Sequence, residues 1–221
     1  GREAESRAAA LATNRGGETA TLYFGGGTPS MLSDTHLGHL METLNRLVPV
    51  DKLDEFSFEA NPATFTEKKV RFWRSLGMTR VSLGVQSLDS GILHLLGREH
   101  TQALHSVEML KNAGMPHINM DLMFAIPGQT LSIWEATLKE AVRAGTDHIS
   151  AYNLTYEEDT EFFRSLLRGE KRQDPDEDAT FFELAEHMLE AAGLRHYETS
   201  NYAREGCLSP HNMAYWKGED Y

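Results

Sequence analysis

The sequence predicts an α/β fold in which parallel strands alternate with helices. Short apolar runs typical of buried strands recur five times, and segments with helical periodicity separate them. The spacing between successive strands is about 30 residues, which fits a TIM-type barrel or part of one. A doubly wound open sheet is the alternative that this pattern leaves open.

Each predicted strand is a short apolar run that ends at a turn signal. The first run ends at three consecutive glycines, and the second ends at Asn61-Pro62. Right-handed crossovers would join these strands into one parallel sheet. The strands are expected at residues 21–24, 56–59, 80–85, 118–123 and 148–154.

The predicted helices carry apolar residues at positions i, i+3, i+4 and i+7. Ser33 fits an N-cap for the first helix, with Asp34 in its first turn. A charged stretch over 157–178 indicates a short helix and a loop, and residues 195–221 form an aromatic and polar tail. The helices are expected at residues 35–47, 66–76, 90–96, 102–113, 132–144 and 177–192. Glycines that can end a helix follow four of them, at Gly77, Gly114, Gly145 and Gly193.

The composition excludes several classes of function. The 221 residues include 33 acidic and 21 basic side chains, and the net charge of −12 argues against nonspecific binding to nucleic acid or an anionic membrane. No apolar run approaches the roughly 20 residues of a transmembrane helix, so no membrane insertion is expected. Cys207 is the single cysteine, which excludes an intrachain disulfide and favours a reducing, cytoplasmic setting.

The turn Gly25-Gly26-Gly27-Thr28-Pro29 after the first strand is the most informative segment. Consecutive glycines permit unusual backbone angles and let a ligand approach closely, and exposed amides can receive a carboxylate or phosphate. α/β folds bind ligands at the carboxyl ends of their strands. The segment therefore indicates a ligand site, with a simple strand-to-helix turn as the alternative.

Other polar residues fall on or after the later strands. Glu59 and Asp121 lie within apolar strands, where a carboxylate needs partners. They could bind hydroxyls or an amine of a small ligand, or they could be satisfied by backbone amides or by Arg98. Because several of these groups are expected at one edge of the sheet, a shared ligand site is favoured.

Seven motifs, in order and with fitting spacing, carry a resemblance to one protein family. From about residue 22 to 221 the chain resembles the radical SAM proteins related to oxygen-independent coproporphyrinogen III oxidase, most of all their HemW branch, the heme chaperones. The motifs are FGGGTPS, EANP, SLGVQS, LGREH, DLMFAIPGQT, YETSNYA and HNMAYW.

The resemblance implies a partial TIM-type (β/α)6 barrel that holds S-adenosylmethionine and a [4Fe–4S] cluster. It divides the chain into an N-terminal helical or flexible segment (1–20), a barrel portion (21–175), and a last barrel helix with the start of a C-terminal region (176–221). The barrel's first strand and the C-terminal domain would be missing, and since the chain begins with Gly1 we expect a fragment.

The resemblance also assigns contacts to S-adenosylmethionine. A glycine turn would donate amides to its carboxylate, carboxylates would accept from its amine or ribose hydroxyls, and an arginine would supply a bidentate fork. Gly26, Gly27 and Thr28 would cradle the methionine part. The residues that match the further contacts are Glu59, Gln86, Arg98 and Asp121, with Thr155 as an additional candidate.

One departure from the family concerns the iron–sulfur cluster. The family holds its cluster with three cysteines in a CxxxCxxC loop, whereas this chain has only Cys207. We expect the loop to precede Gly1, so the cluster would belong to the full-length protein alone. The chain itself is then expected to hold no metal and no catalytic residue, and to be inactive in reductive cleavage of S-adenosylmethionine.

The segment His211-Asn212-Met213-Ala214-Tyr215-Trp216 matches the HNxxYW signature of the HemW branch, where it is associated with heme binding. A neutral imidazole is a common axial ligand of heme iron, and Tyr and Trp offer flat apolar surface to a porphyrin. His211 is therefore the candidate heme ligand, and Cys207 is a second candidate. A structural aromatic cluster is the alternative.

Two functions follow from the resemblance. The first is a heme chaperone that binds heme and delivers it to an acceptor protein. The alternative is a coproporphyrinogen III oxidase-like enzyme of heme biosynthesis, because the barrel motifs are common to both. A generic α/β ligand-binding barrel of another family is a third possibility. Heme bound through His211 would favour the first function, and substrate turnover would favour the second.

Overall fold

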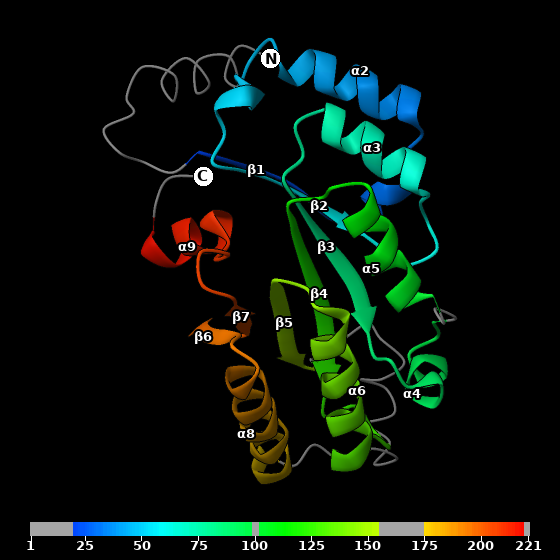
Figure 1. Ribbon diagram of the computed structural model, residues 1–221, viewed down its shortest axis with the longest axis vertical. Helices are drawn as coiled ribbons and strands as arrows, with labels where there is room; N and C mark the ends of the chain where they lie inside the picture. The colour runs from blue at the N-terminus through cyan, green and yellow to red at the C-terminus, as the bar shows by residue number, and fades with distance from the viewer. Residues whose placement is uncertain (1–19, 99–101, 155–174, 219–221) are drawn as a thin grey trace. The chain divides into compact units, whose positions relative to one another are not determined.

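The computed structural model describes residues 20–98, 102–154 and 175–218, and within them strands alternate with helices as predicted (Figure 1). The strands follow the order β1-β2-β3-β4-β5-β7-β6. They are β1 (Thr21–Phe24), β2 (Glu55–Ala60), β3 (Arg80–Gln86), β4 (His117–Phe124), β5 (His148–Asn153), β6 (Arg195–Glu198) and β7 (Asn201–Ala203).

The helices lie close to their predicted positions, with ends that differ by a few residues. They are α2 (Asp34–Leu44), α3 (Glu67–Ser75), α4 (Ser90–Leu95), α5 (Ala103–Asn112), α6 (Leu131–Ala144), α8 (Pro175–Ala191) and α9 (Pro210–Lys217), with 3-10 turns η1 (Pro29–Met31) and η2 (Val50–Lys52). Ser33 caps α2 as predicted, since its side chain accepts a hydrogen bond from the amide of His36. Among the described residues, no helix is both long enough and apolar enough to cross a membrane.

The chain folds as two compact units. Of the described residues, the first unit contains 20–83, 105–118 and 209–218, and the second contains 84–98, 102–104, 119–154 and 175–208.

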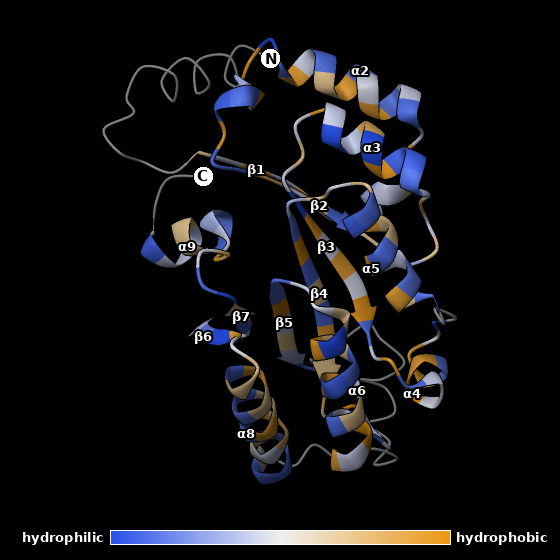
Figure 2. Ribbon diagram, in the orientation of Figure 1, coloured by the Kyte–Doolittle hydropathy of each residue, from blue (hydrophilic) through white to orange (hydrophobic). Residues whose placement is uncertain are grey.

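The strands of the first unit have one apolar and one polar face. β1 and β2 are parallel with Phe24 opposite Phe58, and β2 and β3 are parallel with Phe58 opposite Val81. Because side chains alternate along a strand, these apolar residues share one face, and the residues between them share the other. Figure 2 shows the alternation as bands along β3. The residues on the polar face are Thr21, Tyr23, Glu55, Ser57, Glu59, Arg80 and Ser82.

The apolar face of the first unit packs against helices α2 and α3. The ring of Phe58 lies 4.8 Å from the indole of Trp73 on α3, and both side chains are fully buried. Helices α2 and α3 lie side by side (Figure 1), and Gly38 of α2 faces the ring of Phe72. The apolar core is thus on the helix side, which leaves the polar face for a ligand.

The second unit continues the pattern and then departs from it. β4 and β5 are parallel, with Asp121 opposite Ser150, whereas β7 is antiparallel to both β5 and β6. Helices α6 and α8 pack together (Figure 1), where the indole of Trp134 donates a hydrogen bond to the backbone oxygen of Phe181 at 3.0 Å. The sequence patterns assign no regular element to residues 195–221, and the structure forms β6, β7 and α9 there.

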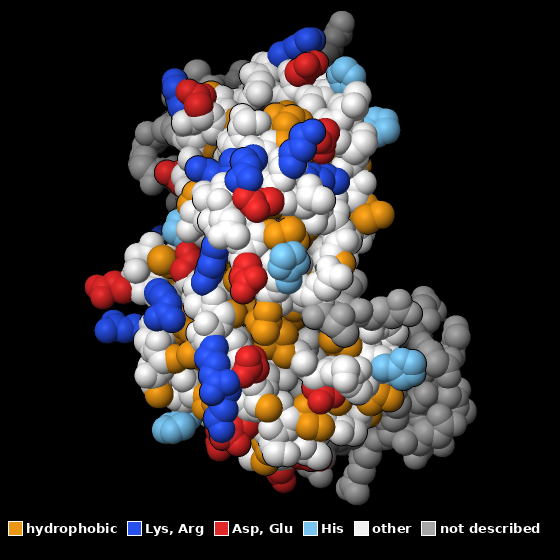
Figure 3. Space-filling view, turned by 45° about the vertical axis from the view of Figure 1, so that its right-hand side comes forward, with side chains coloured by type: hydrophobic (Ala, Val, Ile, Leu, Met, Phe, Trp, Pro, Cys, Tyr) orange, Lys and Arg blue, Asp and Glu red, His pale blue; other side chains and the backbone are white. Residues whose placement is uncertain are grey.

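Charged side chains of both signs are mixed on the surface. On the face shown in Figure 3, Lys and Arg side chains lie among Asp and Glu side chains. On α6, for example, Lys139 pairs with Glu135 at 2.6 Å, and both are exposed. Such exposed pairs contribute little to stability.

Candidate functional site

Each of the three positions after β1 requires glycine for a structural reason, and the reason at Gly25 differs from that at Gly26 and Gly27. A Cβ atom on Gly25 would lie 2.4 Å from Cε1 of Tyr23 and 2.9 Å from Oε1 of Glu59, so packing excludes a side chain there. Gly26 and Gly27 have φ angles of +81° and +58°, in the left-handed region that favours glycine. Among the described residues, no atom lies within 4 Å of a Cβ atom built on either of them. The turn is therefore open on the side of Gly26 and Gly27.

Glu59 lies against this turn and uses both of its carboxylate oxygens. Oε1 accepts a hydrogen bond from the hydroxyl of Tyr23 at 2.5 Å, and Oε2 accepts one from the amide of Gly26 at 2.9 Å. Satisfaction by a backbone amide, one of the alternatives that the sequence leaves open, therefore occurs for this carboxylate. The two bonds hold Glu59 in a defined position beside the turn.

The turn and Glu59 together present groups that match an α-amino acid. The amides of Gly27 and Thr28 donate a hydrogen bond to none of the described residues, and exposed amides in such a turn can bind a carboxylate. A carboxylate has about four acceptor positions, so Glu59 retains capacity for an ammonium group. Asn61 of the EANP motif donates to Oγ1 of Thr28 at 3.3 Å, which ties the two motifs together. These residues fit the amino-acid end of S-adenosylmethionine.

The HNxxYW motif forms α9, and the N-cap residue of this helix is bonded to β2. Ser209 accepts a hydrogen bond from the amide of Asn212 and donates one to Oε1 of Glu55 at 2.8 Å. The other oxygen of Glu55 accepts from Nε of Arg80 at 2.5 Å, and both charged side chains are buried. The hydrogen bond from Ser209 to this buried carboxylate holds the start of α9 on the polar face, and hydrogen bonds to charged groups are stronger than those between neutral groups.

His211 contacts β1 in two ways. Its ring stacks on that of Tyr23, with centroids 4.8 Å apart and planes 11° apart, and its Nδ1 lies 2.8 Å from Oγ1 of Thr21. Burial lowers the pKa of His211 below its ordinary value, although the nearby charge of Glu55 opposes the shift. The imidazole is therefore neutral at pH 7, which is the form that binds iron.

The second nitrogen of His211, Nε2, is the candidate position for a ligand. None of the described residues forms a hydrogen bond with Nε2 of His211. When Nδ1 donates its proton to Thr21, Nε2 presents its lone pair, as in histidines that ligate metals. Tyr215 lies one helical turn further along α9, and its side chain is 64% exposed, while that of Trp216 is 55% exposed. An imidazole next to exposed aromatic surface fits a heme.

Three of the other predicted contacts, Gln86, Arg98 and Asp121, lie in the second unit. Gln86, the last residue of β3, is buried with a φ angle of +68°, and its Oε1 accepts from the hydroxyl of Tyr152 at 3.2 Å. Positive φ in a residue other than glycine costs energy and is often found at functional sites. Arg98 follows α4 and is half-buried, and Thr155 lies outside the described residues.

Asp121 lies in the middle of β4, whereas the site is expected at the strand ends. Its Oδ1 accepts a hydrogen bond from Nδ2 of Asn119 at 2.6 Å, and Oδ1 of Asn119 lies 2.6 Å from Nδ1 of His148. Tyr197 completes this chain at Nε2 of His148. The structure therefore links Gly26 to Glu59 and, through Tyr23, to His211, and it places Asp121 in a separate polar network of the second unit.

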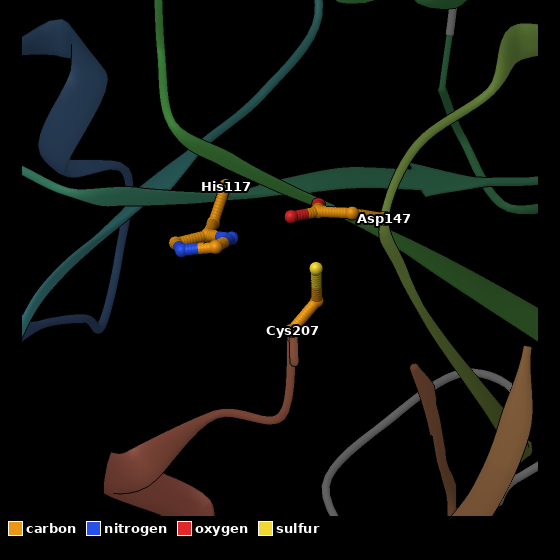
Figure 4. Close-up of side chains that lie close together, drawn as sticks. All are labelled: His117, Asp147 and Cys207. Atoms are coloured by element: carbon orange, nitrogen blue, oxygen red, sulfur yellow. The ribbon is translucent and has the colours of Figure 1, made fainter. Parts of the chain in front are cut away.

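Cys207, the second candidate heme ligand, is half-buried and lies in the second unit. Its thiol lies within 4.8 Å of a carboxylate oxygen of Asp147 in the same unit (Figure 4), and its role as a heme ligand stays a prediction. His117, also drawn in Figure 4, belongs to the other unit. One thiol is also too few for a [4Fe–4S] cluster, which needs several cysteine ligands, so the cysteine content of this chain does not fit that group.

The residues that support Glu59 and His211 are not predicted from the sequence. Tyr23 orients Glu59 and stacks on His211, Thr21 contacts Nδ1, and Ser209 fastens α9. The polar positions that alternate with phenylalanines in β1 and β2 are a signal that could have identified the first two. Nothing in the local pattern predicts the pairing of Ser209 with Glu55, because these residues are far apart in the sequence.

Comparisons with known proteins agree on a family. Residues 2–141 match the family model of the Radical SAM superfamily. The chain is 37% identical to the heme chaperone HemW of Bacillus subtilis, over 91% of this chain and 54% of the relative. It is 36% identical to the mitochondrial radical S-adenosyl methionine domain-containing protein 1 of Danio rerio, over 91% of this chain and 46% of that relative. The chain thus spans about half the length of these curated relatives.

The fold matches solved structures as well. Coproporphyrinogen III oxidase (HemN) of Escherichia coli, described as a radical SAM enzyme, superposes with a TM-score of 0.75 at 21% identity, over 98% of this chain and 50% of that one. The archaeal Elp3 of Methanocaldococcus infernus gives a TM-score of 0.65 at 22% identity, over 83% of this chain and 49% of that one. These likenesses confirm the predicted partial α/β barrel.

Proposed function

Because the chain belongs to the radical SAM superfamily, we propose that it is the barrel portion of a HemW-type heme chaperone, which binds heme and transfers it to an acceptor protein. The names of its relatives from bacteria support this proposal. As the chain covers about half of these relatives, the transfer step and the acceptor protein are part of the proposal for the full-length protein. The single cysteine is in keeping with a cytoplasmic location.

One observation carries the proposal: α9 presents His211 as a neutral imidazole beside exposed aromatic side chains. Thr21 orients the ring through Nδ1, and Tyr23 supports one of its faces. An oriented histidine ligates a metal better than a mobile one, because its partner selects the tautomer. In this proposal Nε2 of His211 binds the heme iron, and Tyr215 and Trp216 contact the porphyrin.

S-adenosylmethionine fits the second site of the same unit. In this proposal the amides of Gly27 and Thr28 bind its carboxylate, and Glu59 binds its ammonium group. Gly26 and Tyr23 hold Glu59 in place, so the carboxylate is positioned before the ligand arrives. With a [4Fe–4S] cluster in the full-length protein, the bound cofactor would supply radical chemistry. Gln86, Arg98, Asp121 and Thr155 remain proposed contacts.

A hemin titration followed by the Soret band tests the proposal. The chain should bind one heme, and His211→Ala should weaken binding at least about tenfold, since a coordinate bond is lost. His39→Ala is the matched control, because His39 is 72% exposed on α2. Equal heme affinity in the wild type and in His211→Ala would overturn the proposal.

The oxidase alternative has a separate outcome. The likeness to HemN is 21% in sequence, so it supports the fold but does not favour its reaction for this chain. Decarboxylation of coproporphyrinogen by the full-length protein, together with heme binding that does not need His211, would support the enzyme instead.

A further inference from the structure

We propose that Tyr23 couples the two ligand sites of the first unit, so that a ligand at the glycine turn tightens heme binding at α9, and the reverse. The inference rests on the proposed function, and it adds a regulatory link between S-adenosylmethionine and heme. Tyr23, which provides this link, lies directly before the FGGGTPS motif.

A continuous chain of contacts joins the two sites. The amide of Gly26 bonds one oxygen of Glu59, and the hydroxyl of Tyr23 bonds the other. The ring of the same tyrosine stacks on His211, with an angle of only 11° between the planes. One rigid phenol therefore contacts Glu59 through its hydroxyl and the candidate heme ligand through its ring face.

The contacts of Tyr23 predict that the two ligands bind with positive cooperativity. The side chain of Tyr23 is 39% exposed, and its bond to Glu59 and its stack on His211 both restrain it before a ligand binds. A ligand that fixes Glu59 restricts the remaining motion of the Tyr23 hydroxyl, and a heme that fixes His211 restricts the remaining motion of the Tyr23 ring. When one ligand has already ordered this side chain, the second does not bear that entropy cost, which gives positive cooperativity.

The coupling must be equal in both directions. If S-adenosylmethionine raises heme affinity by a given factor, heme raises the affinity for S-adenosylmethionine by the same factor. Coupling energies of the usual size correspond to about fivefold or more. We expect a value near the lower end, because a single side chain carries the contact.

The contact between Tyr23 and Glu59 can be removed while α9 keeps its bond to β2. Tyr23→Phe removes the hydroxyl that bonds Glu59 but retains the ring that faces His211. Helix α9 keeps its contact with β2, since Ser209 bonds Glu55 independently of Tyr23. Thr21→Val is a contrasting variant, because it removes the bond to Nδ1 of His211 and leaves Glu59 untouched. Tyr202→Phe is the control, since the buried hydroxyl of Tyr202 has no hydrogen-bond partner among the described residues.

The experiment is a hemin titration of each variant, with and without saturating S-adenosylmethionine. The wild type and Tyr202→Phe should bind heme about fivefold more tightly with S-adenosylmethionine. Thr21→Val should bind heme more weakly but retain that factor. In Tyr23→Phe the factor should fall to about one, whatever its basal heme affinity.

Three results would overturn the inference: no effect of S-adenosylmethionine on the wild type, the same factor in Tyr23→Phe, or no binding of S-adenosylmethionine by dialysis. Each is compatible with heme binding through His211, so the heme-binding part of the proposed function would stand. A different result would overturn the proposed function, namely the same heme affinity in the wild type and in His211→Ala.

Discussion

The imidazole of His211 lies flat on the phenol ring of Tyr23, with ring centroids 4.8 Å apart. This stack joins the last motif of the chain to its first strand. It orients a neutral histidine whose Nδ1 also meets Thr21, and it places that histidine one side chain away from Glu59. The proposed heme and S-adenosylmethionine sites therefore share one polar face of the first unit.

Stability should depend on pH through His211. Burial lowers the pKa of this residue in the folded chain, so below the ordinary histidine pKa of about 6.5 the unfolded chain binds more protons. The free energy of unfolding should therefore fall as pH drops through that value towards the lowered pKa, and should recover above it. Urea unfolding at several pH values measures this dependence.

His211→Phe is the control for the pH dependence, since it keeps a ring on Tyr23 and removes the titrating group. The slope of unfolding free energy against pH between about 5 and 7 should be smaller in this variant. An unchanged or larger slope would contradict the assignment of a lowered pKa to His211.

Glu59 should be needed for binding of S-adenosylmethionine. Glu59→Gln removes the negative charge that we assign to the ammonium group, so affinity should fall at least about tenfold, in line with a lost charge-assisted hydrogen bond. Equilibrium dialysis with labelled S-adenosylmethionine measures the change. Glu42→Gln on α2 should have no effect, because Glu42 is 69% exposed. Equal affinity in the two variants would exclude Glu59 from the site.

Two glycine-to-alanine variants should change stability in opposite directions. Gly25→Ala places a methyl group against Tyr23 and Glu59, so it should lower the free energy of unfolding by about 1–3 kcal/mol. In Gly38→Ala, in the middle of α2, the new methyl group meets only the ring edge of Phe72 at 4.0 Å. Because glycine destabilises a helix relative to alanine, this variant should raise the free energy of unfolding by about 0.5–1 kcal/mol. Chemical denaturation checks both values, and a stabilised Gly25→Ala would contradict the close packing of the turn.

Without cluster cysteines, the chain should not cleave S-adenosylmethionine reductively. It has one cysteine, and a [4Fe–4S] cluster needs several thiolates. With iron, sulfide and a strong reductant supplied, the 221-residue chain should form no 5′-deoxyadenosine by chromatography. Formation of this product above the level of a protein-free control would show that the cluster is held in another way.

The repeating part of the fold is predictable from the sequence, because the hydrophobic patterns there are local. Strands β1 to β5 and their helices come from short apolar runs, helical periodicity and terminal glycines. β6, β7 and α9 are harder to predict, because polar and aromatic residues alternate there without a clear period. His196, for example, stacks on Tyr202 through pairing of β6 with β7, which no local pattern reveals.

The candidate site is predictable to a different extent at each residue. The glycine turn and Glu59 are marked by their motifs, and the structure brings Gly26 and Glu59 together. The contribution of Tyr23 depends on strand pairing and on the return of α9 to β1, which are tertiary features. The division of the chain at residues 20 and 175 stays a prediction, as do all the ligand contacts assigned from the motifs.

The central claim is that His211 would hold the iron of a bound heme, and replacing this residue tests the claim most directly. Heme is loaded onto the Cys207→Ala variant with and without His211→Cys, so that the native thiol cannot interfere. If His211 binds the iron, His211→Cys exchanges an imidazole for a thiolate and shifts the Soret band of ferric heme. Identical Soret spectra of the two heme-loaded variants would contradict the account.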